Sequence, residues 1–289
     1  MMSCLLRMMV IVLCGGSLAG VSHAHGTHSD LMKLVDDQLA REPRNGELWY
    51  RRAELDLEHG DWAETLRDLE KTEECAPGKF PVLWVKGQVL DAENKPEEAK
   101  GVLDTFLSGN PTHWAALASR ARVETKLGLH EKAVLDYTAA LANNREAEPD
   151  LVQETAACLA ANGHDDEAIR VLEAGLKRLG AIPSLQIKVI EVEVNARRYD
   201  AALARVAMIE KSAPRPEPWM VQRAGILIRA ERPREARATW ESLLSHLQSL
   251  PDAERGSHAM SVFARQARTA IASLDSSTAR SNPFASPNP

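Results

Sequence analysis

The residues with the clearest potential for chemistry are two histidines near the N-terminus, His25 and His28, in the run from His25 to Asp30. If the chain is cut after Ala24, His25 carries a free α-amine. That amine and the two imidazoles offer the nitrogen ligands that suit Cu(II) and Ni(II). A metal-handling protein that uses this leader is therefore one hypothesis, and a polar leader without a metal is the simpler interpretation.

The rest of the sequence has none of the patterns that mark an enzyme. It has no G-x-S-x-G, no glycine-rich phosphate loop, no HExxH and no carboxylate pair that stands apart from ordinary helix-surface charges. We therefore expect no catalytic site and no cofactor. An enzyme, or an enzyme subunit, whose site is assembled from unmarked positions is the alternative.

Residues 1–24 resemble a secretory signal peptide. Arg7 is their only charge, and an apolar run follows from Met8 to Leu13. Small residues before Ala24 predict cleavage after that residue, with Ala19 as the second choice. The apolar run is too short to span a bilayer comfortably, and no later segment resembles a transmembrane helix. We expect a periplasmic or secreted protein without a transmembrane segment in its mature chain.

The charge balance of the mature chain bears on its partners. Removal of residues 1–24 leaves 34 basic and 41 acidic residues, a net charge of −7. A surface of this sign repels phosphate backbones, which disfavours nucleic acid as a partner.

A period of 34 residues organises the chain from residue 46 to residue 250. Aromatic residues make up only 4% of the sequence, and Ala, Leu, Glu and Arg favour helix. The fourth and twenty-fourth places of the period hold mostly large residues, Trp49 and Leu69 in the first block, whereas the eighth and twentieth are mostly small, Ala53 and Thr65. The predicted blocks are 46–79, 80–113, 114–147, 149–182, 183–216 and 217–250, with Glu148 as one extra residue.

Each block is expected to form a helix, a turn and a second helix. Small residues let the two helix axes approach, and large ones fill the space beside them. The turn requires a left-handed backbone, for which glycine is best suited. The turn place holds Gly60, Asn94, Gly128, Gly163, Arg197 and Glu231. Turns five and six, which have Arg197 and Glu231, depart from this preference.

This helical period resembles the tetratricopeptide repeat (TPR) family. The resemblance implies an all-α fold, a right-handed α-solenoid of about six 34-residue repeats that stack because no hairpin buries its own apolar face. Residues 25–45 are predicted to hold the leader and an N-terminal capping helix over Ser29–Arg41, N-capped by Ser29 or Asp30. A C-terminal capping helix is predicted within 251–275, as one helix over Asp252–Leu274, and a disordered tail over 276–289.

The seventh place of the period carries cations where the family usually has an apolar residue. It holds Arg52, Lys86, Arg120 and Arg223. One interpretation is a ladder that binds an anionic polymer. The interpretation we favour is structural, because Asp68 and Asp136 lie sixteen residues after Arg52 and Arg120, on the facing helix, and long stems pack while charged heads reach water.

The resemblance implies that exposed residues of the first helices line a concave groove that binds a protein or peptide. Tyr50 and Trp84 are the expected anchors, because rigid aromatic residues offer large contact areas at little entropic cost. A clamp for a C-terminal carboxylate is disfavoured, since Glu54 would repel it. The candidate groove residues are Tyr50, Glu54, Trp84, Gln88, Asp91, Arg122, Lys126, Gln153, Lys188, Glu191 and Arg229.

Two cysteines, Cys75 and Cys158, remain in the mature chain. At least two hairpins separate them, packed helices lie about 8–10 Å apart, and a disulfide requires Cα atoms within ~7 Å. We expect two free thiols. A catalytic cysteine would require a neighbouring histidine in a cleft, and His164 is expected in a turn.

The resemblance therefore implies a non-catalytic, exported scaffold or assembly factor that binds a protein or peptide in the groove. Besides the metal-handling hypothesis, an accessory subunit of an envelope or polysaccharide-export machine is an alternative that would use the same groove.

Overall fold

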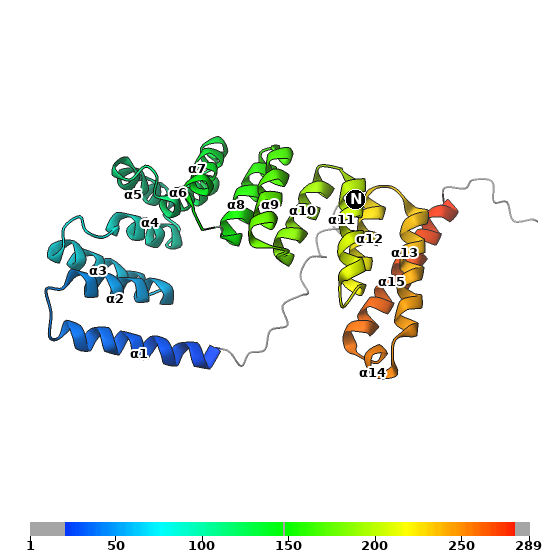
Figure 1. Ribbon diagram of the computed structural model, residues 1–289, viewed down its shortest axis with the longest axis horizontal. Coiled ribbons are helices and arrows are strands. Elements are labelled where there is room, and N and C mark those ends of the chain that lie inside the picture. The colour runs from blue at the N-terminus through cyan, green and yellow to red at the C-terminus, as the bar shows by residue number, and fades with distance from the viewer. Residues whose placement is uncertain (1–20, 147, 281–289) are drawn as a thin grey trace, which may run out of the picture. The chain divides into compact units, whose positions relative to one another are not determined.

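The computed structural model describes residues 21–146 and 148–280, which form fifteen α-helices and no strand (Figure 1). Twelve of these helices pair as six consecutive hairpins, which confirms the predicted all-α repeat architecture. The first helices are α2 (Gly46–His59), α4 (Val82–Ala92), α6 (Trp114–Lys126), α8 (Pro149–Ala161), α10 (Pro183–Asn195) and α12 (Glu217–Arg229). The second helices are α3 (Trp62–Cys75), α5 (Pro96–Gly109), α7 (His130–Asn143), α9 (Asp165–Leu179), α11 (Tyr199–Ser212) and α13 (Pro233–Ser249).

The chain divides into two compact units, Met1–Asp136 and Tyr137–Pro289. The boundary falls inside α7, so unit 1 contains α1–α6 with the start of α7, and unit 2 contains the rest of α7 with α8–α15. Among the described residues, no helix has both the length and the apolar character needed to cross a membrane.

All six hairpin turns have the same backbone geometry, whichever residue occupies them. The turn residues have φ between 57° and 89°, including the three that are not glycine, Asn94, Arg197 and Glu231. In each turn the next residue donates its N–H to the carbonyl five positions earlier, as from Asp61 to Asp56. This bond and the left-handed residue define the Schellman motif. Turns five and six therefore keep the geometry, although a residue with a Cβ costs about 1 kcal/mol there.

The two small columns lie in the core of each hairpin. The eighth place includes Ala53, Ala121, Ala156 and Ala224, all fully buried, and the twentieth runs from Thr65 to Ala236, also fully buried at each position. Gly87 shows how close the helices approach, because a Cβ there would lie 2.7 Å from Cγ of Leu103 in α5. Small side chains are thus required where the two helices of a hairpin meet.

The N-terminal capping helix is longer than predicted. Helix α1 spans Val21–Leu39, so Ser29 and Asp30 lie inside it rather than at its N-cap. The residues before Ser29 contain no proline, and the helix therefore meets no obligatory break. The predicted cleavage site after Ala24 falls within α1, and the remainder of the predicted signal peptide, residues 1–20, lies outside the described residues.

The C-terminal cap also differs from its prediction. Two helices, α14 (Asp252–Arg255) and α15 (His258–Arg280), replace the single helix expected over Asp252–Leu274. Gly256 ends α14, and the hydroxyl of Ser257 accepts a hydrogen bond from the N–H of Met260 at the start of α15. Met260 is buried with Trp240 and Leu243 of α13.

Helix α15 also enters the segment predicted to be disordered. It continues to Arg280, because no proline interrupts the chain before Pro283. The structure therefore has residues 276–280 in a helix, and residues 281–289 of the predicted tail lie outside the described part.

Two glycines in the second hairpin should respond in opposite ways to substitution by alanine. Gly87→Ala should lower the free energy of unfolding by about 1–2 kcal/mol, because the new Cβ overpacks against the buried Leu103. Gly101→Ala should raise it by about 0.5–1 kcal/mol, because its Cβ position in α5 is open and alanine favours helix. Urea denaturation followed by circular dichroism measures both, and equal effects would contradict the close approach of α4 and α5.

Candidate functional site

The first helices α2 and α4 border a depression of about 320 Å³, which we call the Tyr50–Trp84 pocket. Four predicted groove residues, Tyr50, Glu54, Trp84 and Gln88, come together there. The complete lining is Tyr50, Arg51, Glu54, Leu55, Leu57, Glu58, Trp84, Val85 and Gln88. The first helices of two consecutive hairpins thus form one surface at these four residues.

Contacts with neighbouring residues restrain the two aromatic side chains of this pocket. The Tyr50 ring stacks on Phe80, with centroids 4.9 Å apart. The Trp84 indole N–H donates to Oγ of Ser119 over 3.1 Å, and its ring lies 5.0 Å from that of His113. Because these contacts restrain both rings, little conformational entropy remains to be lost when a ligand packs on them.

Tyr50 and Glu54 lie one helical turn apart on α2 and line the same pocket. Burial, and then the negative charge of Glu54, raise the pKa of Tyr50, so the hydroxyl keeps its proton. Partial desolvation raises the pKa of Glu54, the Tyr50 hydroxyl opposes this rise, and the charge of Glu58 adds to it. The pocket therefore gathers negative charge on one side of α2.

Two further predicted groove residues of unit 1 bind each other. Nζ of Lys126 in α6 lies 2.6 Å from Oδ1 of Asp91 in α4. This ion pair joins the first helices of consecutive hairpins, so these charges neutralise one another in the absence of a ligand. Arg122 is exposed on α6.

The predicted groove residues of unit 2 make short-range contacts of their own. Lys188 pairs with Glu191 within α10 at 3.0 Å, and Gln153 donates to the carbonyl of Pro149 over 3.4 Å. Arg229 of α12 donates to Oδ1 of Asn195 in α10 over 3.2 Å, again between first helices one repeat apart.

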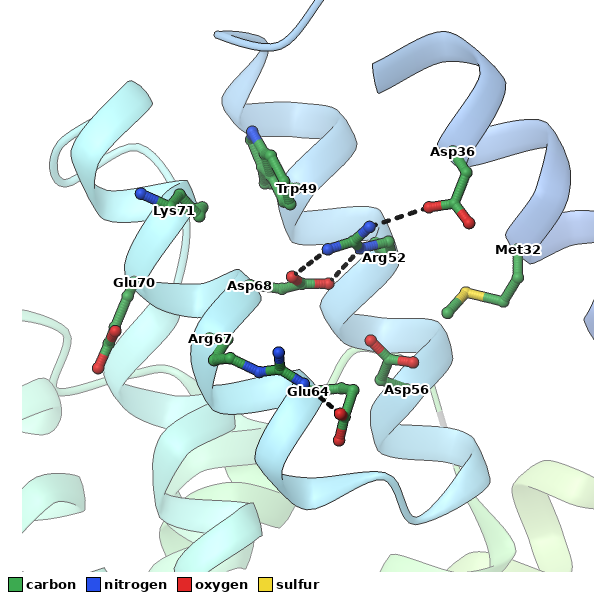
Figure 2. A pocket seen from close by; sticks show the side chains of 10 residues that line it. All are labelled: Met32, Asp36, Trp49, Arg52, Asp56, Glu64, Arg67, Asp68, Glu70 and Lys71. Carbon is green, nitrogen blue, oxygen red and sulfur yellow. Dashed lines mark hydrogen bonds and ion pairs between the residues drawn. The ribbon is translucent and has the colours of Figure 1, made fainter. Parts of the chain in front are cut away.

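A second depression, of about 480 Å³, lies on the other side of α2, where α1, α2 and α3 meet (Figure 2). We call it the Arg52 pocket. Arg52 donates from Nε and Nη2 to both oxygens of Asp68 in α3, each over 2.6 Å, and from Nη1 to Asp36 in α1 over 2.9 Å. Its guanidinium also lies 4.6 Å from the centre of the Trp49 ring. The predicted pairing of Arg52 with Asp68 is confirmed.

The same arrangement recurs two repeats later, in the third hairpin. Arg120 donates to both oxygens of Asp136 over 2.6 and 2.8 Å and to Asp104 of α5 over 2.9 Å. The predicted pairing with Asp136 is therefore confirmed as well. Asp36 precedes Arg52 by 16 residues, and Asp104 precedes Arg120 by the same number. Helix α1 therefore contacts α2 in the way that α5, the second helix of its hairpin, contacts α6.

Sequence reasoning missed these preceding carboxylates and a column of buried acids. The eleventh place holds Asp56, Glu124 and Glu193 in hairpins one, three and five, exposed by only 3%, 2% and 3%. Hairpins two, four and six have buried leucine there: Leu90, Leu159 and Leu227. This alternation, and the sixteen-residue spacing on both sides of Arg52, are signals that the sequence contains.

The buried acids are placed beside the ionic pairs of the same hairpins. Burial, and then the charge of Asp68, raise the pKa of Asp56 to about 7. Burial, and then the charge of Asp136, raise the pKa of Glu124. In the fifth hairpin Glu193 accepts from Arg205 of α11 over 2.9 Å, so there the acid lies on the first helix and the arginine on the second.

The other cations of the seventh place do not continue this pattern. Lys86 is exposed on α4. Arg223 of α12 lies 3.3 Å from Glu210 of the preceding helix α11. Arg52 and Arg120 thus share one arrangement, whereas Lys86 and Arg223 each have different surroundings, which supports the structural interpretation of this column over an extended anion-binding ladder.

The N-terminal histidines and the cysteines were the other candidates for chemistry. The ring of His28 stacks on that of His59 with centroids 4.3 Å apart. His25 belongs to α1, and its side chain lies outside what the structure describes. Within the described residues no three His, Cys, Asp or Glu side chains converge to hold a metal ion. Cys75 and Cys158 are not joined in a disulfide, as predicted.

The repeated hairpins, their left-handed turns and their small-residue core together define a tetratricopeptide-type α-solenoid fold. Solved structures with this fold are similar to the chain. PilW, a widely conserved type IV pilus biogenesis factor, matches with a TM-score of 0.56 at 17% identity, over 66% of this chain and 89% of its own. A tetratricopeptide repeat protein from Parabacteroides merdae matches with a TM-score of 0.53 at 19% identity, over 83% of this chain and 94% of its own.

PilF of Pseudomonas aeruginosa matches with a TM-score of 0.52 at 13% identity, over 78% of this chain and 99% of its own. No protein-family model matches the sequence, and no curated protein matches it. The similarity at this level of identity establishes the fold.

Replacement of Arg52 by methionine should lower the free energy of unfolding of unit 1 by about 2–4 kcal/mol, because it leaves the buried Asp68 carboxylate without its partner. Arg52→Met combined with Asp68→Leu should recover most of this loss. Arg67→Met, which removes an exposed pair with Glu64, is the matched control and should cost less than about 0.5 kcal/mol. Urea unfolding of the three variants tests this, and equal losses for Arg52→Met and Arg67→Met would contradict it.

Asp56 should make the stability of unit 1 depend on pH. Its pKa rises from 3.8 to about 7 on folding, so the folded state binds the proton more tightly. The tighter proton binding adds to the free energy of unfolding. This contribution is complete below about pH 4 and is lost as the pH rises through 7. Asp56→Asn should therefore be more stable than the wild type at pH 8, by about 1–3 kcal/mol, and close to it at pH 4. Urea midpoints at both values measure the difference. Asp37→Asn, on an exposed position of α1, should show no such change.

Proposed function

We propose that the protein is a non-catalytic scaffold or assembly factor that binds a protein or peptide partner through the inner surface of its first helices. The observation that carries the proposal is the Tyr50–Trp84 pocket. It joins two consecutive first helices and presents two restrained aromatic rings at an open depression. Rigid aromatic residues next to polar groups are the composition of protein-binding hot spots.

The distribution of charge favours the Tyr50–Trp84 pocket over the Arg52 pocket as the binding site. In the Arg52 pocket the arginine already has two carboxylate partners, Asp36 and Asp68. The Tyr50–Trp84 pocket instead has two carboxylates on α2, Glu54 and Glu58, beside the neutral Tyr50 hydroxyl. Groups that keep hydrogen-bonding capacity are those that a partner can use.

A non-catalytic role agrees with what lines the two pockets. Neither lining includes a serine, cysteine or histidine. The guanidinium of Arg52 and the carboxylate of Asp68 are already paired with each other. The proposal of export rests on residues 1–24, whose sequence resembles a signal peptide.

Photocrosslinking in the native host tests this function. A p-benzoylphenylalanine at position Arg51, at the pocket, should capture a partner, whereas the same residue at position Lys79, exposed beyond α3, should not. Tyr50→Ala with Trp84→Ala should reduce capture at least about tenfold, because both anchors are removed. Since Trp84 also packs on the core, Tyr50→Ala with Gln88→Arg provides a second variant that fills the pocket.

Far-UV circular dichroism of each variant controls for folding, and the protein recovered from the extracytoplasmic fraction should begin at His25. Undiminished capture by both folded variants would contradict the groove, and recovery of the uncut chain in the cytoplasm would contradict export.

A further inference from the structure

We infer that the Tyr50–Trp84 pocket selects a basic side chain, lysine or arginine, on the partner segment that enters it. This inference rests on the proposed function and specifies the chemistry of the partner at this site. It is carried by the charges that line the pocket, by their spacing on α2, and by the aromatic and apolar surface next to them.

The ionised lining of the pocket is negative overall. Glu54 and Glu58 contribute two carboxylates and Arg51 contributes one cation. The three lining residues of α4, Trp84, Val85 and Gln88, are uncharged. A partner that brings a positive charge is therefore attracted, and one that brings a carboxylate, including a C-terminal one, is repelled.

Glu54 and Glu58 are four residues apart and lie on the same face of α2. Like charges at this spacing destabilise a helix, and the charge of Glu58 contributes to the raised pKa of Glu54. A cation placed between the two carboxylates would relieve this repulsion and gain two charge-assisted hydrogen bonds. The empty pocket thus holds an unfavourable interaction that a basic side chain removes.

The rest of the lining suits the stem of such a side chain. Leu55 and Leu57, both half-buried, add apolar surface to the lining beside the Trp84 ring. Lysine and arginine pack their methylene stems on apolar surfaces while the charged head reaches polar groups. The faces of Trp84 and Tyr50 also attract a cation, and both rings are already restrained by Ser119 and Phe80.

Selection of peptides on the full chain tests this inference. A displayed library of random twelve-residue peptides is selected on the wild type and counter-selected on the Tyr50→Ala/Gln88→Arg variant, so that the recovered peptides depend on the pocket. We expect lysine or arginine to be enriched at one position. Replacement of that residue by norleucine should weaken binding, measured by fluorescence anisotropy, at least about tenfold.

Glu54→Gln with Glu58→Gln should weaken the selected peptides by a similar factor and remove most of the dependence of binding on salt. The matched control is Glu47→Gln with Asp37→Asn, which makes the same change in net charge at exposed positions outside the pocket and should leave binding unchanged. The two variants separate a local effect from the overall field of the protein.

Three results would overturn the inference. Pocket-dependent peptides without a basic residue, or peptides that bind Glu54→Gln/Glu58→Gln as well as the wild type, would show that the pocket binds peptides but does not select a cation, which leaves the proposed function intact. Failure to recover any pocket-dependent peptide would instead contradict the proposed function, and this inference with it.

Discussion

The bond between one arginine and two carboxylates is the interaction on which the arrangement of unit 1 depends. Arg52 links α1, α2 and α3, and Arg120 links α5, α6 and α7. A guanidinium is suited to this place because its planar fork of donors serves two acceptors at once while its stem stays packed. Since the side chain of Asp68 is only 3% exposed, its charge requires that partner. The same contact therefore closes a hairpin and joins it to the helix before it.

The alternation of acid and leucine at the eleventh place restricts how the hairpins stack. Hairpins one, three and five bury an acid near an arginine, whereas hairpins two, four and six bury a leucine at the same place. The acids move with their own hairpins, but a shift by one repeat would separate each arginine from the carboxylate that the preceding helix supplies. These pairs are Arg52 with Asp36, Arg120 with Asp104 and Arg205 with Glu173. The ionic hairpins thus contribute to the order of stacking, while the small residues of the twentieth place, common to all six hairpins, allow the close packing of each helix pair.

The two sides of α2 serve different purposes because their charges are satisfied differently. On the side of the Arg52 pocket, cation and carboxylates neutralise one another and hold three helices together (Figure 2). On the side of the Tyr50–Trp84 pocket, two carboxylates lie beside restrained aromatic rings and apolar surface. In the proposed function, stability and recognition are separated by the period of the helix, which places neighbouring residues on different faces.

The sequence alone determined the period, the hairpins, their turns and the pairing of Arg52 with Asp68, because helices and turns depend on residues only a few positions apart and the repeat shows each pattern six times. Only the tertiary structure decided which side chains of neighbouring helices meet: Asp36 as second partner of Arg52, the burial of Asp56, and the ion pair of Asp91 with Lys126. It also decided the ends of α1 and α15, where no repeated pattern applies. Contacts of this kind depend on how whole helices pack, which the local spacing of residues does not contain.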